Sequence, residues 1–224
     1  LSFFGGMLLI IKWVLTLGTP DIEKETHTLV QSPSSRRCTS FFIGKVTVIG
    51  RENLPVENGK APAPVYVANH ASQLDVTSVY SLDRRFRWIA KKSVYYLPGV
   101  GLLIYLGGHV VIDRRTGKNK KSVSNLFEVS NKSVQEGVPM IIFPQGTRAI
   151  ATELPLKNGA FVIAQTNKSP LVPISIEIPM NAWNSAYPVN QLWGGVVPEI
   201  KLTVHRPVNV TGREDMDDLK QRIR

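Results

Sequence analysis

Residues 65–75 read VYVANHASQLD, an apolar run followed by a histidine and, five positions later, a carboxylate. The β-branched and aromatic residues favour a buried strand over residues 65–68, and we expect a helix to begin near Ser72. Five positions along one continuous helix are roughly 500° of rotation, which would put the two side chains on different faces. His70 is therefore expected in the turn before the helix, where its ring can fold back towards Asp75.

This histidine and carboxylate have the chemistry of a general base and its orienting partner. An imidazole accepts a proton from a hydroxyl near neutral pH, and a carboxylate fixes its tautomer and stabilises the imidazolium. A second interpretation stays open, because residues 72–75 also fit a capping box in which Asp75 only satisfies backbone N–H groups. The motif alone does not decide between them.

Strand and helix patterns alternate along the rest of the chain. Strands are expected over residues 45–50, 65–68, 87–90, 110–112, 140–143, 171–176 and 200–205. Helices are expected over about 72–82, 99–106, 118–135 and 157–166, and a last one has Met216, Leu219 and Ile223 on one side. This order predicts an α/β fold with a mixed, largely parallel sheet flanked by helices.

The first 18 residues are almost wholly apolar and are interrupted by Lys12. A spanning helix needs roughly 20 apolar residues, so we expect a membrane-associating helical segment that either spans or lies at the interface. A helix closing over the core and a cleaved targeting segment are the alternatives. Residues 21–39 are polar, and residues 31–37 predict a loop within a linker. We therefore divide the chain into an N-terminal segment and linker, 1–40, and one domain, 41–224, that looks truncated at both ends.

The composition narrows the class of partner. The 27 Lys and Arg against 17 Asp and Glu give a net charge of +10, which favours a polyanionic partner. Because no helix-turn-helix, RNA-binding or zinc-finger signature is present, an anionic membrane surface is favoured over nucleic acid, and a basic nucleic-acid binder remains a competing class. Cys38 is the only cysteine, so we expect no intrachain disulfide and a reducing compartment.

Three further motifs follow the first one in order: GHVVIDRR at 108–115, IIFPQGTR at 141–148 and LVPISI at 171–176. Together the four resemble the glycerolipid acyltransferase family, which shares a His-x4-Asp box and three later blocks. The resemblance implies transfer of a fatty acyl group from acyl-CoA or acyl carrier protein to the sn-2 hydroxyl of lysophosphatidic acid, forming phosphatidic acid at a membrane. Glycerol 3-phosphate or another lysophospholipid is the alternative acceptor, and a non-catalytic lipid-binding protein is the alternative of another class.

The acyl-transfer hypothesis gives each candidate residue a role. His70 would take the proton of the acceptor hydroxyl and Asp75 would orient it, so no enzyme nucleophile is required, and no Gly-x-Ser-x-Gly elbow occurs. Gly146, Thr147 and Arg148 offer backbone N–H groups, a hydroxyl and a guanidinium for the acceptor phosphate.

The family resemblance adds further substrate ligands. It implies Arg114 as a second phosphate ligand, with Arg115 as a weaker candidate, and a lysine after the strand 87–90, which is Lys91 or Lys92. It also draws attention to Gln145, where the commonest family form has glutamate. We expect the amide to position Arg148 or a hydroxyl and to alter acceptor affinity, whereas an essential carboxylate at this position would put activity in doubt.

His109 and the tryptophan residues are expected to have roles outside the catalytic pair. His109 lies in a strand-like run and is predicted to be a satisfied core or rim histidine. No spacing supplies a third ligand beside His70 and Asp75, so we predict no metal site and no cofactor. Trp88 is expected in the core, and three other tryptophans are candidates for a lipid interface: Trp13, Trp183 and Trp193.

Overall fold

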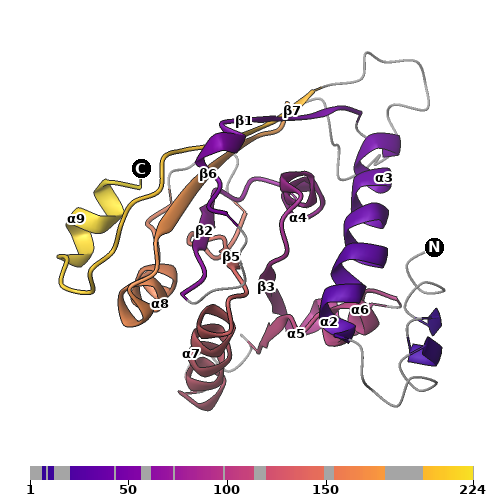
Figure 1. Ribbon diagram of the computed structural model, residues 1–224, viewed down its shortest axis with the longest axis horizontal. Coiled ribbons are helices and arrows are strands. Elements are labelled where there is room, and N and C mark those ends of the chain that lie inside the picture. Colours follow the sequence, from indigo (N-terminus) through magenta and orange to yellow (C-terminus); the bar gives the residue numbers. More distant parts are fainter. Residues whose placement is uncertain are drawn as a thin grey trace.

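The structure is a computed structural model that describes residues 7–8, 10–12, 21–42, 44–56, 62–72, 74–97, 99–113, 120–148, 154–179 and 199–223. Within these residues a seven-stranded sheet lies between two layers of helices (Figure 1). The strands, in chain order, are β1 (Val46–Ile49), β2 (Val65–Ala68), β3 (Arg87–Lys91), β4 (Val110–Ile112), β5 (Met140–Ile142), β6 (Leu171–Glu177) and β7 (Ile200–Val204). Each lies where the hydrophobic pattern predicts a strand.

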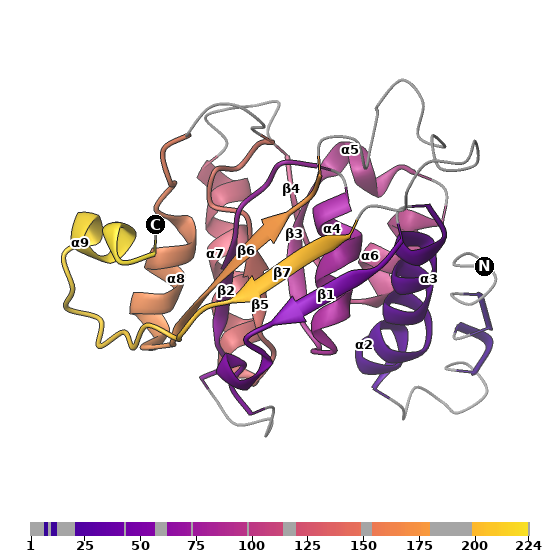
Figure 2. The ribbon, with the colours of Figure 1, turned by 90° about the horizontal axis from the view of Figure 1, so that it is seen from above.

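The strand order across the sheet is β1-β7-β6-β2-β5-β3-β4. From β6 to β4 all neighbouring strands are parallel. At the other edge β7 runs antiparallel to β6, and β1 is parallel to β7 (Figure 2). The prediction of a mixed, largely parallel sheet flanked by helices is therefore confirmed.

The central strand β2 is buried on both faces, because all four of its residues are buried. Tyr66 and Ala68 pack into one apolar cluster, which includes Leu74 of α4 (Leu74–Ser78) and Val79 of the 3-10 turn η3 (Val79–Leu82). Val65 and Val67 pack into the other cluster with residues of the helices on the opposite face. A continuous apolar strand without alternation is the pattern expected when helices cover both faces of a parallel sheet.

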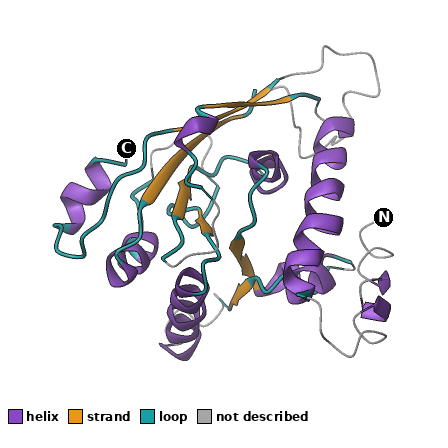
Figure 3. Cartoon of the chain, in the orientation of Figure 1, coloured by secondary structure: helices purple, strands orange, loops and turns teal. Residues whose placement is uncertain are grey.

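The helices on that opposite face lie side by side and are coloured purple in Figure 3. They are α7 (Lys120–Gln135), α8 (Gly159–Asn167) and α9 (Met216–Gln221). Leu219 is fully buried, and Met216 and Ile223 pack against the same apolar cluster, as their shared side of the helix predicts. Two further helices, α5 (Lys92–Tyr95) and α6 (Val100–Leu106), lie between β3 and β4 in the chain, and only the second follows from the sequence pattern.

The predicted loop at residues 31–37 is wrong, because these residues are helical. A continuous helical segment runs through α2 (Ile22–Glu25), the π-helix η1 (Thr26–Gln31) and α3 (Ser32–Phe42). A prolyl ring meets the carbonyl four residues earlier in a regular α-helix, and the wider π-turns directly before Pro33 relieve that clash. Tertiary packing stabilises the segment, since Val30 and Gln31 are buried and α3 packs on α4.

None of the helices formed by the described residues is both long enough and apolar enough to cross a bilayer. Of the first 18 residues, 7–8 and 10–12 are described, and they are helical with exposed Met7, Leu8 and Ile11 side chains. Lys12 Nζ lies 2.6 Å from Glu25 Oε1 in α2. Trp13, Trp183 and Trp193 lie outside the described residues, and Trp88 is partly buried against the core. The membrane-associating segment stays a prediction.

Candidate active site

The turn between β2 and α4 carries His70 and brings it to Asp75 as predicted. His70 Nδ1 lies 2.8 Å from Asp75 Oδ2. The carboxylate side chain is fully buried, whereas 17 % of the histidine side chain is exposed. Because a carboxylate only accepts hydrogen bonds, the imidazole proton belongs on Nδ1, and the lone pair of Nε2 is left to accept a proton.

The same carboxylate also caps α4. Asp75 Oδ2 accepts hydrogen bonds from the backbone N–H groups of Ala71 (2.7 Å) and Ser72 (2.8 Å), and Ser72 Oγ accepts from Leu74 N–H (3.2 Å). This reciprocal pattern is that of a capping box. Both interpretations of the motif, orienting partner and capping box, are therefore correct. Asp75 Oδ2 orients the imidazole and also accepts hydrogen bonds from backbone N–H groups at the start of α4. The other oxygen, Oδ1, is buried and has no hydrogen-bond partner in the described part of the chain.

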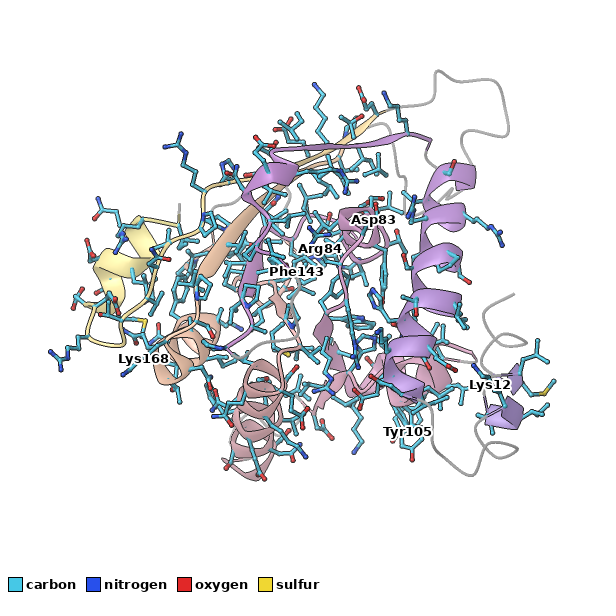
Figure 4. All side chains as sticks on the ribbon, in the orientation of Figure 1. Lys12, Asp83, Arg84, Tyr105, Phe143 and Lys168 are labelled. Carbon is cyan, nitrogen blue, oxygen red and sulfur yellow. The ribbon has the colours of Figure 1, made fainter. Side chains whose placement is uncertain are left out.

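Three contacts fix the position of the turn. The imidazole stacks on the partly buried Phe143, which follows β5 and is labelled in Figure 4, with ring centroids 4.4 Å apart. The backbone N–H of His70 donates to Gln145 Oε1 at 3.0 Å. Asn69 bonds to the backbone of Ile176 in β6, donating to its carbonyl at 2.9 Å and accepting from its N–H at 2.6 Å. The turn is thus held by both neighbouring strands.

The loop after β5 carries the predicted phosphate ligands. Thr147 and Arg148 are exposed, at the carboxyl end of the strand next to β2. Gly146 has a positive φ of 72°, and its N–H donates to the Phe143 carbonyl at 2.9 Å. That N–H closes the turn and is not available to a phosphate, which corrects one part of the expected cradle.

A cation that sequence reasoning missed lies against this loop. A Cβ atom built on Gly146 would lie 2.6 Å from Lys157 Nζ, so the ammonium lies directly over the glycine. Lys157 is exposed, and its backbone N–H donates to the Pro144 carbonyl at 2.9 Å. No spacing rule marks this lysine, because it comes from the segment before α8 and reaches the loop only in the folded chain. It adds a second positive charge beside Arg148.

Of the other predicted ligands, the two lysines lie one strand further along the same edge. Lys91 ends β3, and Lys92 begins α5; both are exposed. Lys92 Nζ forms an ion pair with Asp113 Oδ2 at 3.0 Å, so Lys91 is the better candidate for a substrate ligand. Arg114 and Arg115 lie outside the described residues. The carboxyl ends of three neighbouring parallel strands, β2, β5 and β3, thus present His70, the loop after β5 and Lys91 at one edge, where α/β folds place their sites.

His109 is a satisfied core histidine, as predicted. Its Nδ1 accepts from the Trp88 backbone N–H (3.2 Å), and its Nε2 lies 3.1 Å from Gln31 Oε1. Burial, followed by the charges of His27 and Arg87, lowers the pKa of His109 from 6.5 to about 3. This histidine therefore fastens the N-terminal helices to the sheet and takes no part in the site.

Comparison with known proteins places the chain in a family. A family model described as Acyltransferase matches residues 45–177, more than half of the chain. The chain belongs to this acyltransferase family. The chain is also similar to a 1-acyl-sn-glycerol-3-phosphate acyltransferase of Chlamydomonas reinhardtii, 38 % identical over 133 residues, which cover 59 % of this chain and 38 % of the relative.

Two other relatives carry the same enzyme name. The human beta form is 30 % identical over 165 residues, covering 66 % of this chain and 59 % of its own length. The Helicobacter pylori form is 30 % identical over 155 residues, covering 68 % and 62 %. The chain therefore spans about 38 % to 62 % of the lengths of these relatives.

A solved structure has the same fold. The 1-acyl-sn-glycerophosphate acyltransferase PlsC of Thermotoga maritima superimposes with a TM-score of 0.68 and 22 % sequence identity, over 99 % of this chain and 85 % of that chain. At this identity the likeness supports the architecture alone. It agrees with the largely parallel sheet described above.

Proposed function

We propose that this chain is the catalytic part of an O-acyltransferase that moves a fatty acyl group from a thioester, acyl-CoA or acyl carrier protein, to the sn-2 hydroxyl of lysophosphatidic acid. The observation that carries the proposal is the His70–Asp75 pair, with Nδ1 held by the buried carboxylate and Nε2 left to accept a proton. The names of the family relatives support the choice of reaction and acceptor.

In the proposed reaction the acceptor supplies the nucleophile. His70 Nε2 takes the proton of the glycerol hydroxyl while its oxygen attacks the thioester carbonyl carbon. Asp75 stabilises the imidazolium through Nδ1–H. When the tetrahedral intermediate collapses, the C–S bond breaks, and the imidazolium returns its proton to the leaving thiolate. The products are an ester and a free thiol, and no metal or other cofactor enters the step.

The acceptor phosphate would be held beside the base. Arg148, Thr147 and Lys157 follow β5, the strand next to β2, at a spacing of roughly 5 Å between neighbouring strands. Lys91 at the end of β3 extends this set of ligands, and the sequence resemblance adds Arg114. Gln145 positions the catalytic turn through its bond to the His70 backbone, so a glutamine can serve at this position without a charge.

We further infer that the apolar residues 1–18 associate with a membrane that carries anionic lipids. The exposed Met7, Leu8 and Ile11 side chains and the net charge of +10 support this inference. Replacing Leu8 and Ile11 by glutamate should lower binding of the chain to phosphatidylglycerol vesicles. Unchanged sedimentation with the vesicles would contradict it.

The deciding experiment measures thiol release with acyl-CoA and acyl carrier protein donors and a panel of acceptors: lysophosphatidic acid, glycerol 3-phosphate, other lysophospholipids and no acceptor. Release that depends on lysophosphatidic acid is expected. The matched variants are His70→Ala, which should lower kcat by about 10²- to 10⁴-fold, and His109→Gln, which should keep it. A folded His70→Ala protein with wild-type rate, or a wild type that releases no thiol with any acceptor, would overturn the proposal.

A further inference from the structure

A second cleft opens beside the catalytic turn, on its β6 side. Its volume is about 660 Å³, which is within the usual range for small-molecule sites. We call it the Ser175–His205 cleft, and the polar residues that line it are Asn69, Gln145, Ser175, Glu177, His205, Arg206 and Arg222. Asn69 and Gln145 are the two side chains that hold the His70 turn in place. A ligand in this cleft would therefore lie against the back of the catalytic turn.

The strand register places the cleft close to the reacting atoms. β2 pairs with β6 so that Ala68 is opposite Ile174, which brings Ser175 level with Asn69, the residue before His70. Ser175 Oγ lies 2.8 Å from His205 Nε2, and His205 N–H donates to the Pro173 carbonyl at 2.9 Å. Ser175 thus lies one strand spacing, roughly 5 Å, from the catalytic turn, and His205 follows β7, one strand further.

The lining combines cations, neutral hydrogen-bonding groups and apolar surface. Arg206 and Arg222 are exposed, and the described residues form no ion pair with either of them. Glu177 is the acidic residue of the lining. Leu156 and Ile223 supply apolar walls. This combination suits an elongated ligand with a phosphate, amide groups and short alkyl stretches.

We propose that the Ser175–His205 cleft binds the phosphopantetheine arm of the thioester donor, an inference that rests on the proposed acyl transfer. This arm has a phosphate for the two arginines and amides for Ser175, His205 and Asn69. It ends in the sulfur that carries the acyl group, which must reach His70. The arm is common to coenzyme A and acyl carrier protein, so one cleft serves both donors.

A larger groove elsewhere is a poorer match. It has a volume of about 1080 Å³ and lies between α3 and the residues that precede β3 and β5, at the amino ends of those strands. Three of the five arginines that line it already have carboxylate partners: Arg36 and Arg51 pair with Asp83, and Arg85 pairs with Asp21 and Glu23. A donor phosphate there would compete with these ion pairs and would lie at the edge of the parallel strands opposite to His70.

The test is binding without acceptor, measured by calorimetry with coenzyme A, holo acyl carrier protein, apo acyl carrier protein and adenosine 3′,5′-bisphosphate. Coenzyme A and the holo carrier should bind, whereas the apo carrier and the bisphosphate, which lack the arm, should bind at least about tenfold more weakly. The double variant Arg206→Glu/Arg222→Glu reverses both charges. It should weaken the binding of both arm-bearing ligands by about tenfold or more. The matched control is Arg213→Glu, an exposed arginine of the same segment outside the cleft, which should not change binding.

Kinetics separate the cleft from the proposed function. In the double variant the KM for the donor should rise while kcat and the KM for lysophosphatidic acid stay near wild type. Equal donor binding in wild type and double variant, a bisphosphate that binds as tightly as coenzyme A, or an apo carrier that binds as tightly as the holo carrier would overturn the proposal. Arm-specific binding by a wild-type protein that transfers no acyl group to any acceptor would refute the proposed function and still support the cleft.

Discussion

His70 follows β2 and His109 directly precedes β4, and the surroundings of the two imidazoles are opposite. His70 donates from Nδ1 to a buried carboxylate and keeps Nε2 for a proton. His109 accepts at Nδ1 from a backbone N–H, so its proton belongs on Nε2, which faces Gln31. The two rings are therefore opposite tautomers. A base needs an accessible lone pair and an anion behind it, and His109 has neither.

The two histidines are expected to contribute to different properties, His70 to catalysis and His109 to stability. Substitutions around His70 should change kinetic constants and have small effects on the free energy of unfolding. The turn lies at the carboxyl end of the central strand β2, and the His70 ring is partly exposed. Substitutions around His109 should change the free energy of unfolding, because its ring links η1 to the sheet and is buried. Each prediction below tests one side of this division.

The largest effect is expected from Asp75→Asn. The amide oxygen can still accept from the backbone N–H groups of Ala71 and Ser72, so the helix cap is retained. The charge that stabilises the imidazolium is lost, and kcat should fall by between about 10²- and 10⁴-fold. Asp75→Ala should lose the cap as well, at a cost of about 1 kcal/mol in unfolding free energy. Steady-state kinetics and urea denaturation measure the two effects, and a kcat near wild type in Asp75→Asn would remove the carboxylate from the mechanism.

The second effect concerns stability at acid pH. Burial lowers the pKa of His27 from 6.5 to about 4 and that of His109 from 6.5 to about 3. Since the folded state holds both histidines neutral, the unfolded state binds more protons below pH 6.5, and stability is lost as pH falls from 6.5 towards these folded values. The loss should approach about 1.4 kcal/mol per pH unit for each histidine.

Denaturation at pH 7, 6 and 5 measures this slope. In His109→Gln one titrating group is removed, so the difference in unfolding free energy between pH 7 and pH 5 should shrink by about 2 kcal/mol relative to wild type. His205→Gln is the matched control, because this histidine is exposed. Identical pH slopes in wild type and His109→Gln would contradict the assignment of His109 as a neutral core group.

The central strands were predictable because β2, β5 and most of β6 are buried on both faces and their apolar runs are bounded by glycine, proline or polar residues. β2 and β4 have their predicted bounds, and the others differ by one or two residues. The helical segment through residues 22–42 was not predictable from local propensity, since Pro33 and several serines favour a loop. Contacts of Gln31 and His27 with residues far along the chain stabilise it.

The candidate site also has one part that the sequence predicts and another that only the folded chain brings together. The His70–Asp75 pair is local, within one strand–turn–helix unit, so its spacing alone indicates the contact. Lys157 and the Ser175–His205 pair depend on which segments the fold brings together, and no spacing in the sequence marks them. The availability of the Gly146 N–H also could not be read from sequence, because it depends on how the turn closes.

The third prediction concerns the proposed phosphate ligands, which should affect acceptor binding and leave kcat and stability unchanged. Arg148→Ala and Lys157→Ala should each raise the KM for lysophosphatidic acid by about tenfold, since each removes a charge-assisted bond, while kcat and thermal stability stay near wild type. The matched control is Lys132→Ala, an exposed lysine on α7 away from the strand ends. The effect should disappear with an uncharged acceptor such as monoacylglycerol. Unchanged acceptor kinetics in both variants would move the phosphate site elsewhere.

The smallest effect is expected from Gln145→Glu. The direction of the change in kcat tests whether His70 is the sole base of the site. Gln145 acts on His70 by accepting a hydrogen bond from its backbone N–H, and a carboxylate accepts the same bond. We therefore expect kcat within about threefold of wild type, and a KM for the anionic acceptor raised by about two- to threefold at low salt, because the added charge repels the phosphate.

Gln145→Ala provides the contrast for this position. It leaves the His70 N–H without its partner and frees the turn, so kcat should fall by about tenfold although no charge changes. If the glutamine only holds the turn, the order of kcat is wild type, then Glu, then Ala, with the first two close together. If instead Gln145→Glu raised kcat by tenfold or more, a carboxylate would be required at this position, and His70 would not be the sole base of the site.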